Sequence, residues 1–230
     1  MHRCTLLLAT LLPLWVMASA DEPPMLHPCP DARLQVADAA AADAALVCEG
    51  GARALRFLAD LGLRLPDALR IRVVRSLPPL YGVGQLGSFD ATAGVIEVLA
   101  YDRCATLVSE DLLFDQPLSP DLYRSVVAHE VAHAVVETNY SGDNPCLVAQ
   151  EYIAYTTQFV AMSPELRERI LNASSISAFA GEQQMSAMYY FFDPHAFGIA
   201  AYRHFQDQPD GRPFVWRLLR GEARFPAVSD

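Results

Sequence analysis

Two histidines and a glutamate stand within five consecutive residues near the middle of this 230-residue chain. Residues 129–133 read His-Glu-Val-Ala-His, so His129 and His133 are four positions apart and Glu130 follows the first histidine. On an α-helix, residues at this spacing lie on one face a turn apart, which lets two imidazoles bind one metal ion. Glu130 can then reach a metal-bound water without occupying a coordination position. The HExxH pattern therefore predicts a catalytic zinc site with His129 and His133 as ligands and Glu130 as general base.

A catalytic zinc ion needs a third protein ligand and an open fourth position. The extended pattern HExxHxxGxxH would supply a third histidine, but Val136 replaces its glycine and Asn139 replaces its histidine. Glu151 is favoured because it lies 6 residues after the start of the next predicted helix, and His133 lies 7 residues before the end of its own. At a rise of about 1.5 Å per residue, two antiparallel helices bring both side chains to nearly the same depth, roughly 9–10 Å from the turn. The rival candidates are Asp143, His195 and His204.

An HExxH motif followed by a glutamate in the next helix resembles the gluzincin branch of the zincin metallopeptidases, the thermolysin-like superfamily. The likeness covers residues 119–161 and extends to 70–100, where zincins have a small sheet whose antiparallel edge strand lines the substrate cleft. It implies one set of functional residues, with His129, His133 and Glu151 as zinc ligands and Glu130 as general base. Thermolysin-like enzymes carry an aspartate four residues after the glutamate ligand, whereas this chain has Tyr155. The chain is therefore expected to be an outlying exported member, whose histidine-orienting residues the sequence does not identify.

The resemblance also implies a mechanism for peptide-bond hydrolysis. Zinc lowers the pKa of its bound water to about 7 and polarises the scissile carbonyl, while Glu130 transfers a proton from that water to the leaving amine. The oxyanion needs a further hydrogen-bond donor, which the aromatic-rich stretch 188–205 is expected to supply. His195 and Tyr202 are the preferred candidates in that stretch, and the others are Tyr189, Tyr190 and His204.

Helix start signals predict the elements that must position these residues. A capping side chain followed by proline at the first helical position occurs four times, at Ser119-Pro120, Asn144-Pro145, Ser163-Pro164 and Asp193-Pro194. These signals predict helices near residues 120–140, 145–161, 164–172 and 194–206, and a short helix is predicted near 213–220. The catalytic motif and Glu151 thus fall on consecutive helices.

The first half of the chain mixes helix and strand patterns. Apolar residues at helical spacing from about Ala37 to Leu61 predict two helices with a break at Gly50-Gly51. Strands are predicted at 70–73 and 94–100, and a third strand is expected within 81–90. The predicted fold is α+β and zincin-like, with a small mixed or antiparallel sheet packed on helices and a mainly helical C-terminal half. A single domain is expected over 21–230, with the helix and sheet part at about 36–118 and the helical part at 119–230.

Residues 1–20 predict that the protein is exported from the cytoplasm. An early Arg3, an apolar run to about Met17 and the small residues Ala18-Ser19-Ala20 follow the order of a secretory signal peptide. The run is shorter than a membrane anchor requires and is interrupted by Pro13. We therefore expect a periplasmic or secreted protein with no stable membrane insertion after cleavage.

Removal of this leader leaves four cysteines, which suggests two disulfides in an oxidising compartment. Order and separation favour Cys29 with Cys48 and Cys104 with Cys146, although the sequence alone permits three pairings. A structural zinc site is disfavoured because no two of these cysteines lie closer than 19 positions.

The composition of the chain indicates which kinds of binding partner are expected. Hydrophobic residues make up 52% of the chain and charged residues 19%, which is opposite to the signature of a disordered protein. The 27 acidic residues exceed the 17 basic ones, all arginine, and no basic stripe is present, so a nucleic-acid partner is not expected. The leading prediction is an exported zinc metallopeptidase acting on a peptide or protein. The alternatives are a zincin-like zinc-binding envelope or binding protein without proteolysis, and a zinc hydrolase of a non-peptide bond.

Overall fold

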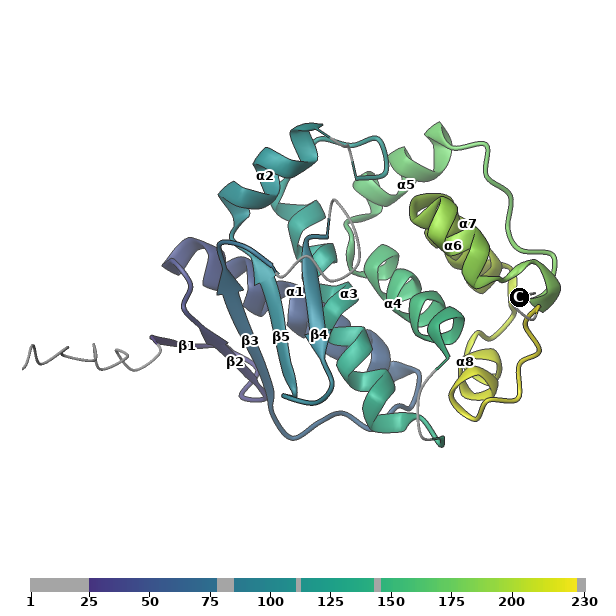
Figure 1. The fold of residues 1–230 in the computed structure, drawn as a ribbon, viewed down its shortest axis with the longest axis horizontal. Coiled ribbons are helices and arrows are strands. Elements are labelled where there is room, and N and C mark those ends of the chain that lie inside the picture. The colour runs from purple at the N-terminus through teal and green to yellow at the C-terminus, as the bar shows by residue number, and fades with distance from the viewer. Residues whose placement is uncertain (1–24, 78–84, 111–112, 143–145, 227–230) are drawn as a thin grey trace, which may run out of the picture.

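The computed structural model describes residues 25–77, 85–110, 113–142 and 146–226 (Figure 1). The predicted signal peptide at 1–20 and the candidate ligand Asp143 lie outside these ranges. In the described ranges no helix has the length and apolar character needed to cross a bilayer. The chain forms an α+β fold that is mostly helical, as predicted, with one small sheet.

Five strands form a mixed sheet in the order β1-β2-β3-β5-β4. Their bounds are β1 Leu26–Pro28, β2 Leu34–Ala37, β3 Leu69–Val74, β4 Gly87–Asp90 and β5 Val95–Leu99. The central pairs β2–β3 and β3–β5 are parallel, whereas β1–β2 and β4–β5 are antiparallel. The predicted strands correspond to β3, β4 and β5, while the short strands β1 and β2 were not predicted.

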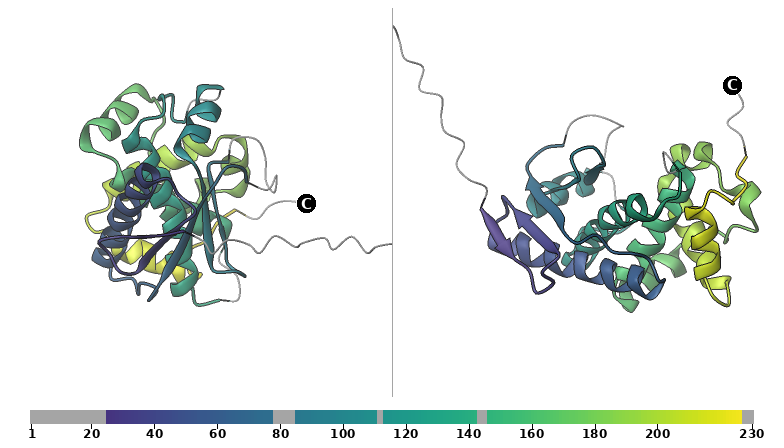
Figure 2. Two further views of the ribbon diagram at one scale, coloured as in Figure 1. Left: turned by 90° about the vertical axis from the view of Figure 1, so that its left-hand side faces the viewer. Right: turned by 90° about the horizontal axis from the view of Figure 1, so that it is seen from below.

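One face of the sheet is covered by helices. In β3 the side chains of Leu69, Ile71 and Val73 are buried, whereas the intervening Arg70 and Arg72 are exposed. This alternation is expected of a strand with one covered face. Helix α1 (Ala41–Asp60) lies against β2 and β3, and helix α3 (Pro120–Asn139) lies against β4 and β5. The later helices extend away from the sheet, so β1 and the C-terminal helices occupy opposite ends of the molecule (Figures 1 and 2).

The remaining α-helices are α2 Tyr101–Glu110, α4 Leu147–Ala161, α5 Pro164–Ala173, α6 Ala187–Phe192, α7 Pro194–Asp207 and α8 Arg212–Leu219. The predicted start residues Ser163 and Asp193 cap α5 and α7. Helix α4 has Cys146 at its N-cap without a side-chain hydrogen bond, and the predicted start Asn144-Pro145 lies outside the described residues. The helices predicted near 120–140, 145–161, 164–172, 194–206 and 213–220 are confirmed as α3, α4, α5, α7 and α8. The short helices α2 and α6 were not predicted.

The predicted break at Gly50-Gly51 is wrong, because α1 runs through both glycines without interruption. Packing explains their presence. A Cβ at Gly50 would lie 2.5 Å from the carbonyl oxygen of Arg124 on α3, and a Cβ at Gly51 would lie 2.9 Å from the Leu34 side chain on β2. The glycines therefore let α1 approach α3 and the sheet closely, and this tertiary packing outweighs their low helix propensity.

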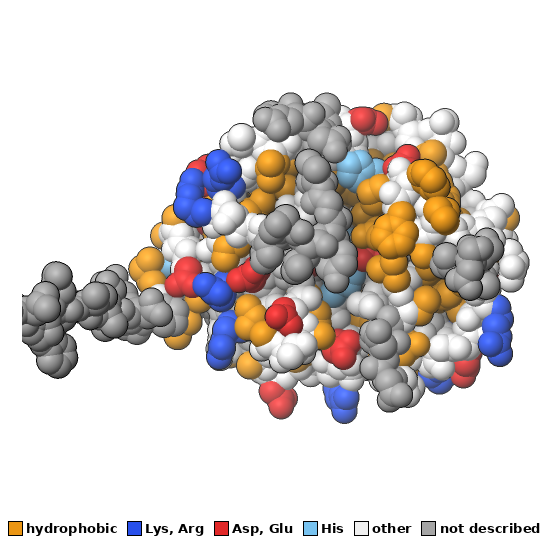
Figure 3. Space-filling model, in the orientation of Figure 1, with side chains coloured by type: hydrophobic (Ala, Val, Ile, Leu, Met, Phe, Trp, Pro, Cys, Tyr) orange, Lys and Arg blue, Asp and Glu red, His pale blue; other side chains and the backbone are white. Residues whose placement is uncertain are grey.

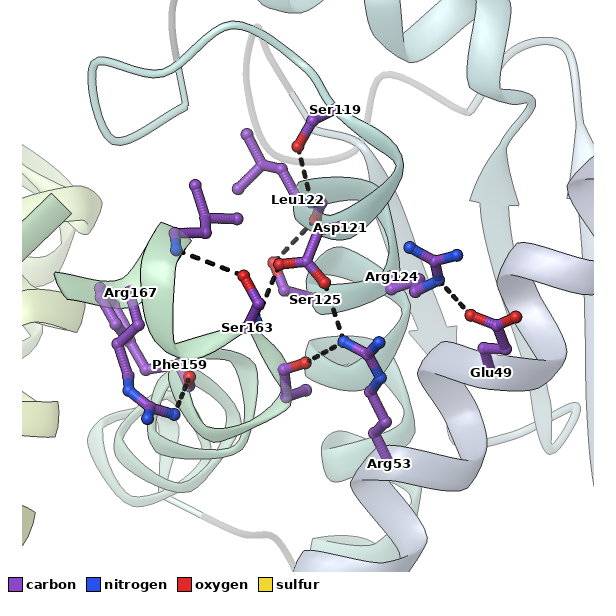
Figure 4. A network of polar contacts seen from close by, with 12 residues as sticks. Glu49, Arg53, Ser119, Asp121, Leu122, Arg124, Ser125, Phe159, Ser163 and Arg167 are labelled. Atoms are coloured by element: carbon purple, nitrogen blue, oxygen red, sulfur yellow. Dashed lines mark hydrogen bonds and ion pairs between the residues drawn. The ribbon is translucent and has the colours of Figure 1, made fainter. Parts of the chain in front are cut away.

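A polar network holds the start of α3, the helix that carries the HExxH motif (Figure 4). The Ser119 hydroxyl caps α3 by accepting a hydrogen bond from the backbone N–H of Leu122. The Asp121 carboxylate accepts hydrogen bonds from the Arg53 guanidinium on α1 and from the backbone N–H of Ser163, both at 2.8 Å. Arg53 also donates to the carbonyl of Ala161, at 2.7 Å. This network joins α1, the start of α3 and the junction between α4 and α5.

We expect Asp121→Asn to lower the free energy of unfolding by about 1–2 kcal/mol at pH 7. Burial raises the pKa of Asp121, but hydrogen bonds from Ser163 and Arg53 outweigh it and leave the pKa below its usual value. Stability contributed by this carboxylate is therefore present above its unfolded-state pKa and is lost as the pH falls through the lower folded-state pKa. Urea unfolding of wild type and variant should show a difference that narrows as the pH falls below about 4.

The matched control is Asp102→Asn. Asp102 also pairs with an arginine, Arg75, but both side chains are mostly exposed. Such pairs contribute about 0–1 kcal/mol, so this variant should stay close to wild type at every pH. Equal effects of the two substitutions, or a pH-independent loss in Asp121→Asn, would contradict a structural role for the Asp121 carboxylate.

The cysteine prediction is half right. Cys29 and Cys48 form a disulfide that links the segment after β1 to α1. The second predicted pair is wrong, because Cys104 and Cys146 are both free thiols. Cys104 is buried against the end of β5, where its thiol donates to the carbonyl of Leu99, whereas Cys146 is exposed at the N-cap of α4. The two residues thus lie in different environments, which their order in the sequence does not reveal.

Thiol titration without reductant should therefore count two free thiols in the denatured chain lacking residues 1–20. In the native protein only Cys146 should react quickly, because Cys104 is fully buried and burial raises the pKa of its thiol to about 12. The variant Cys146→Ser should remove the fast reaction and leave the slow one. A count of no free thiols in the denatured chain would restore the second disulfide.

Candidate metal centre

The structure brings the predicted ligands His129, His133 and Glu151 into one cluster. The Nε2 atom of His129 is 3.5 Å from Glu151 Oε2, and the Nε2 atom of His133 is 3.7 Å from Glu151 Oε1. The two imidazole rings stand edge to face with their centroids 4.9 Å apart. All three candidate ligand atoms lie within 4.8 Å of one another. Helices α3 and α4 therefore position three converging donors, as the helix-spacing argument predicted.

Local sequence explains why Glu151 is buried. Helix α4 is apolar almost all round, and its buried residues run from Val148 to Phe159 with few exceptions. Glu151 is only 6% exposed, and its Oε2 atom has no hydrogen-bond partner among the described residues. Burying a carboxylate without a full set of partners is costly, so buried charges are normally paired or bound to a metal. The Glu151 carboxylate thus has the environment of a ligand and not of a surface acid.

The protonation states of Glu151 and His133 suit a cation. Burial raises the pKa of Glu151, but the neighbouring His129 and His133 outweigh it and leave the pKa below its ordinary value. Burial lowers the pKa of His133 to about 4. Burial also acts to lower the pKa of His129, but the adjacent Glu151 carboxylate, 3.5 Å away, reverses the direction and leaves the pKa raised. An ionised Glu151 and a neutral His133 are the forms that bind a metal ion.

Gln158 is the orienting residue that the sequence did not identify. Its side-chain Oε1 lies 3.1 Å from His129 Nδ1, which leaves Nε2 of the same ring directed at Glu151. A hydrogen bond at the second ring nitrogen fixes the tautomer and the orientation of a metal-binding histidine. Gln158 lies seven residues after Glu151, about two turns along the same face of α4. This spacing from Glu151 is the feature of the sequence that could have identified Gln158.

Tyr155, at the position where thermolysin-like enzymes have aspartate, takes a different role. Its ring packs edge to face against the imidazole of His129, with the centroids 4.7 Å apart. A Cβ at Gly198 of α7 would lie within 3 Å of this ring, so the glycine admits it. Tyr155 therefore supports His129 by packing, and Gln158 supplies the hydrogen bond.

Glu130 is buried beside the cluster but does not belong to it. Burial raises its pKa to about 7, with the charge of Glu151 acting in the same direction and that of His129 opposing it. Its side chain lies directly against Gly87 of the edge strand β4, where a Cβ would come within 2.6 Å of Glu130 Cγ. A carboxyl group with such a pKa can both take and give a proton near neutral pH.

The cluster opens into a cleft of about 710 Å³. Strand β4 and Phe89 form one side of the cleft, and His129, Glu130, His133 and Glu151 line its floor. Tyr155, Tyr190 and His195 contribute to the other side. The antiparallel edge strand thus lines the cleft beside the HExxH residues, and Tyr190 of α6 and Pro194 and His195 of α7 line it as well.

The five candidate donors to the oxyanion differ in whether they line the cleft. Tyr190 and His195 line the cleft together with Glu151, and burial followed by the charge of Glu151 raises the pKa of the Tyr190 hydroxyl. The preferred candidate Tyr202 lies elsewhere, because its ring is buried and stacked on Phe159 with centroids 4.9 Å apart. His204 is buried in a hydrogen bond with the Tyr152 hydroxyl, at 2.7 Å.

Tyr189, the last of the five, packs against Phe179 and Phe197. The helical pattern of the stretch did not distinguish these positions, because aromatic residues occur on all sides of α6 and α7. Two of the five candidates therefore remain as donors, Tyr190 and His195.

Fold and site together define an α+β protein with a His-His-Glu cluster that lines an open cleft and could hold a metal ion. The chain belongs to the family of unknown function DUF6639, whose model matches residues 34–228. No curated protein and no solved structure matches it.

Proposed function

We propose that this protein is an exported, zinc-dependent metallopeptidase with a zincin-like, gluzincin-type site. The observation that carries the proposal is the convergence of His129, His133 and Glu151 beside a buried Glu130 carboxyl group in one cleft. Four tetrahedral ligands at zinc distances of about 2.0–2.1 Å would lie about 3.4 Å apart. The separations of 3.5 Å and 3.7 Å between the histidine nitrogens and the two Glu151 oxygens are close to that value, and the three candidate ligand atoms all lie within 4.8 Å of one another. The Cys29–Cys48 disulfide supports a periplasmic or secreted location.

Zinc held by these three residues would supply a Lewis acid that polarises the carbonyl and makes water nucleophilic near neutral pH. Residues of the chain itself transfer the proton, stabilise the developing negative charge and bind the substrate. Glu130 accepts the proton of the attacking water as a C–O bond forms, and delivers it to the amine nitrogen as the C–N bond breaks. The Tyr190 hydroxyl or the His195 ring donates to the carbonyl oxygen as negative charge develops there. The edge of β4 holds the extended substrate by backbone pairing.

The test is metal analysis combined with hydrolysis of a broad library of internally quenched peptides. The purified protein should contain close to one zinc per chain and should cleave peptides. Chelation should abolish cleavage, and added zinc should restore it. Full zinc occupancy with no cleavage of any peptide would favour a non-proteolytic binding role, and absence of zinc would remove the basis of the proposal.

Gly87→Ala should sharply reduce hydrolysis while leaving zinc affinity nearly unchanged. A Cβ at this position meets the Glu130 side chain at Cγ, Cδ and Oε1, at 2.6–2.9 Å, so Glu130 must move away from its proton-transfer position. A displacement of about 1 Å can cost roughly 100-fold in rate. The value of kcat/KM should therefore fall, while the zinc dissociation constant should stay close to that of wild type.

The control is Gly181→Ala, because this glycine has extended backbone and no described atom lies within 4 Å of the position that a Cβ would take. Gly181→Ala should match wild type in both measurements. Normal hydrolysis by Gly87→Ala would show that the contact between β4 and Glu130 does not position the base.

A further inference from the structure

The short helix α6 exposes an unusual amount of apolar surface. Met188, Phe191 and Phe192 are 53%, 68% and 82% exposed, and no residue of α6 is buried. The described residues contain two other large exposed apolar side chains, Met25 and Leu26 at the N-terminal end. Hydrophobic side chains gather over α6 and α7 on the face shown in Figure 3. Contiguous exposed apolar surface on a folded protein usually marks a binding site.

This surface is continuous with the cleft. Tyr190, from the same helix, lines the cleft together with Glu151. The ring of Phe191 lies 5.6 Å from that of Tyr190, and Pro194 and His195, just beyond α6, also line the cleft. The exposed aromatic side chains of α6 therefore adjoin the residues that line the cleft.

Charge limits the substrates that the cleft can hold. Its described lining includes the carboxylates Asp90, Glu130 and Glu151 but no arginine, and the chain contains no lysine. The carboxylate at the end of a peptide would thus meet no arginine or lysine on this lining. The outer edge of β4 has no strand partner among the described residues and suits the backbone of an extended chain. Binding energy for a peptide must then come from backbone pairing and apolar contact.

We infer that the α6 side chains Met188, Phe191 and Phe192 form a subsite for an apolar or aromatic side chain of an extended peptide bound through the interior of its chain. This inference rests on the proposed function, since the peptide is the substrate of the same cleft. It specifies that function further: cleavage is internal and directed by an aromatic residue.

The test uses the chain lacking residues 1–20 and a set of short peptides blocked at both ends. Each peptide carries one phenylalanine, moved through successive positions of an alanine and glutamine background. Affinity is measured by fluorescence anisotropy with zinc-loaded Glu130→Gln, and kcat/KM is measured with the otherwise wild-type protein. One phenylalanine position should improve both values, and the double substitution Phe191→Ser with Phe192→Ser should reduce that gain roughly tenfold. Leu26→Ser removes a similarly exposed side chain at the opposite end and should change neither value.

The outcomes separate the subsite from the proposed function. Binding that depends on phenylalanine and on Phe191 and Phe192, without any cleavage, would uphold the subsite and reject hydrolysis. Cleavage that is indifferent to phenylalanine and to the double substitution would uphold hydrolysis and overturn the subsite. Binding to vesicles of phosphatidylcholine and phosphatidylglycerol is measured as well, for wild type and for the double variant. Vesicle binding that requires Phe191 and Phe192, with unchanged peptide affinity, would assign the surface to a membrane and overturn the inference.

Discussion

Glu130→Gln should reduce peptide hydrolysis by roughly 100-fold to 10,000-fold while zinc stays bound. Glutamine has nearly the shape of glutamate and preserves the contact with Gly87, but it cannot accept the proton of the attacking water. The site keeps its three candidate ligands, because Glu130 is not a member of the His129, His133 and Glu151 cluster. The measurement pairs kcat/KM for a cleavable peptide with zinc content per chain.

Glu137→Gln provides the control for charge and helix context. Glu137 lies on the same helix as Glu130 but is exposed to solvent and outside the cleft lining. Its replacement should leave both hydrolysis and zinc content at wild-type levels. Full activity in Glu130→Gln would reject Glu130 as the base, even if zinc proved essential.

Glu151→Gln should weaken zinc binding by at least about tenfold, the lower range seen even when residues around a ligand are changed. The substitution removes a buried negative charge that lies 3.5 Å and 3.7 Å from the nitrogens of His129 and His133. A neutral amide is a weaker zinc ligand than a carboxylate, so affinity should fall and hydrolysis should fall with it. Competition against a chromogenic chelator measures the dissociation constant directly.

Two comparisons make this result specific. Glu165→Gln changes an exposed glutamate on α5 and should leave zinc affinity unaltered. Thermal unfolding in excess chelator should show that Glu151→Gln is folded, because removal of an incompletely paired buried charge carries little penalty without metal. Unchanged zinc affinity in a folded Glu151→Gln protein would assign the third ligand to another residue.

The sequence predicted those parts of the fold that local chemistry specifies. Ser119-Pro120 and Ser163-Pro164 cap their helices with the hydroxyl groups that the pattern indicated. Because α3 and α4 run antiparallel, with His129 near Gln158 and His133 near Glu151, the depth argument for the third ligand was also sound. Burial of the residues around Glu151 matches the apolar pattern that set it apart from a surface carboxylate.

The missed features are either very short elements or depend on residues distant in sequence. Strands β1 and β2 have only 3 and 4 residues, too few for a periodic signal. The pair Gly50-Gly51 has the composition of a break, and only its contacts with Arg124 and Leu34 show why it is helical. In the site, Gly87 carries no chemistry of its own, so its contact with Glu130 could not be read from the motif. The second disulfide failed because sequence order does not record that Cys104 packs inside the core.

The close packing of α1 against α3 has a consequence for motion. At Gly50 the two helices approach with no room for a side chain, and α4 packs against both of them. Close-packed interiors resist small displacements, so these three helices should move as one rigid body that includes the metal ligands. Changes in the width of the cleft are then left to the short helix α6, none of whose residues is buried. Substrate entry and product release would therefore depend on an element that carries neither the candidate ligands nor the general base.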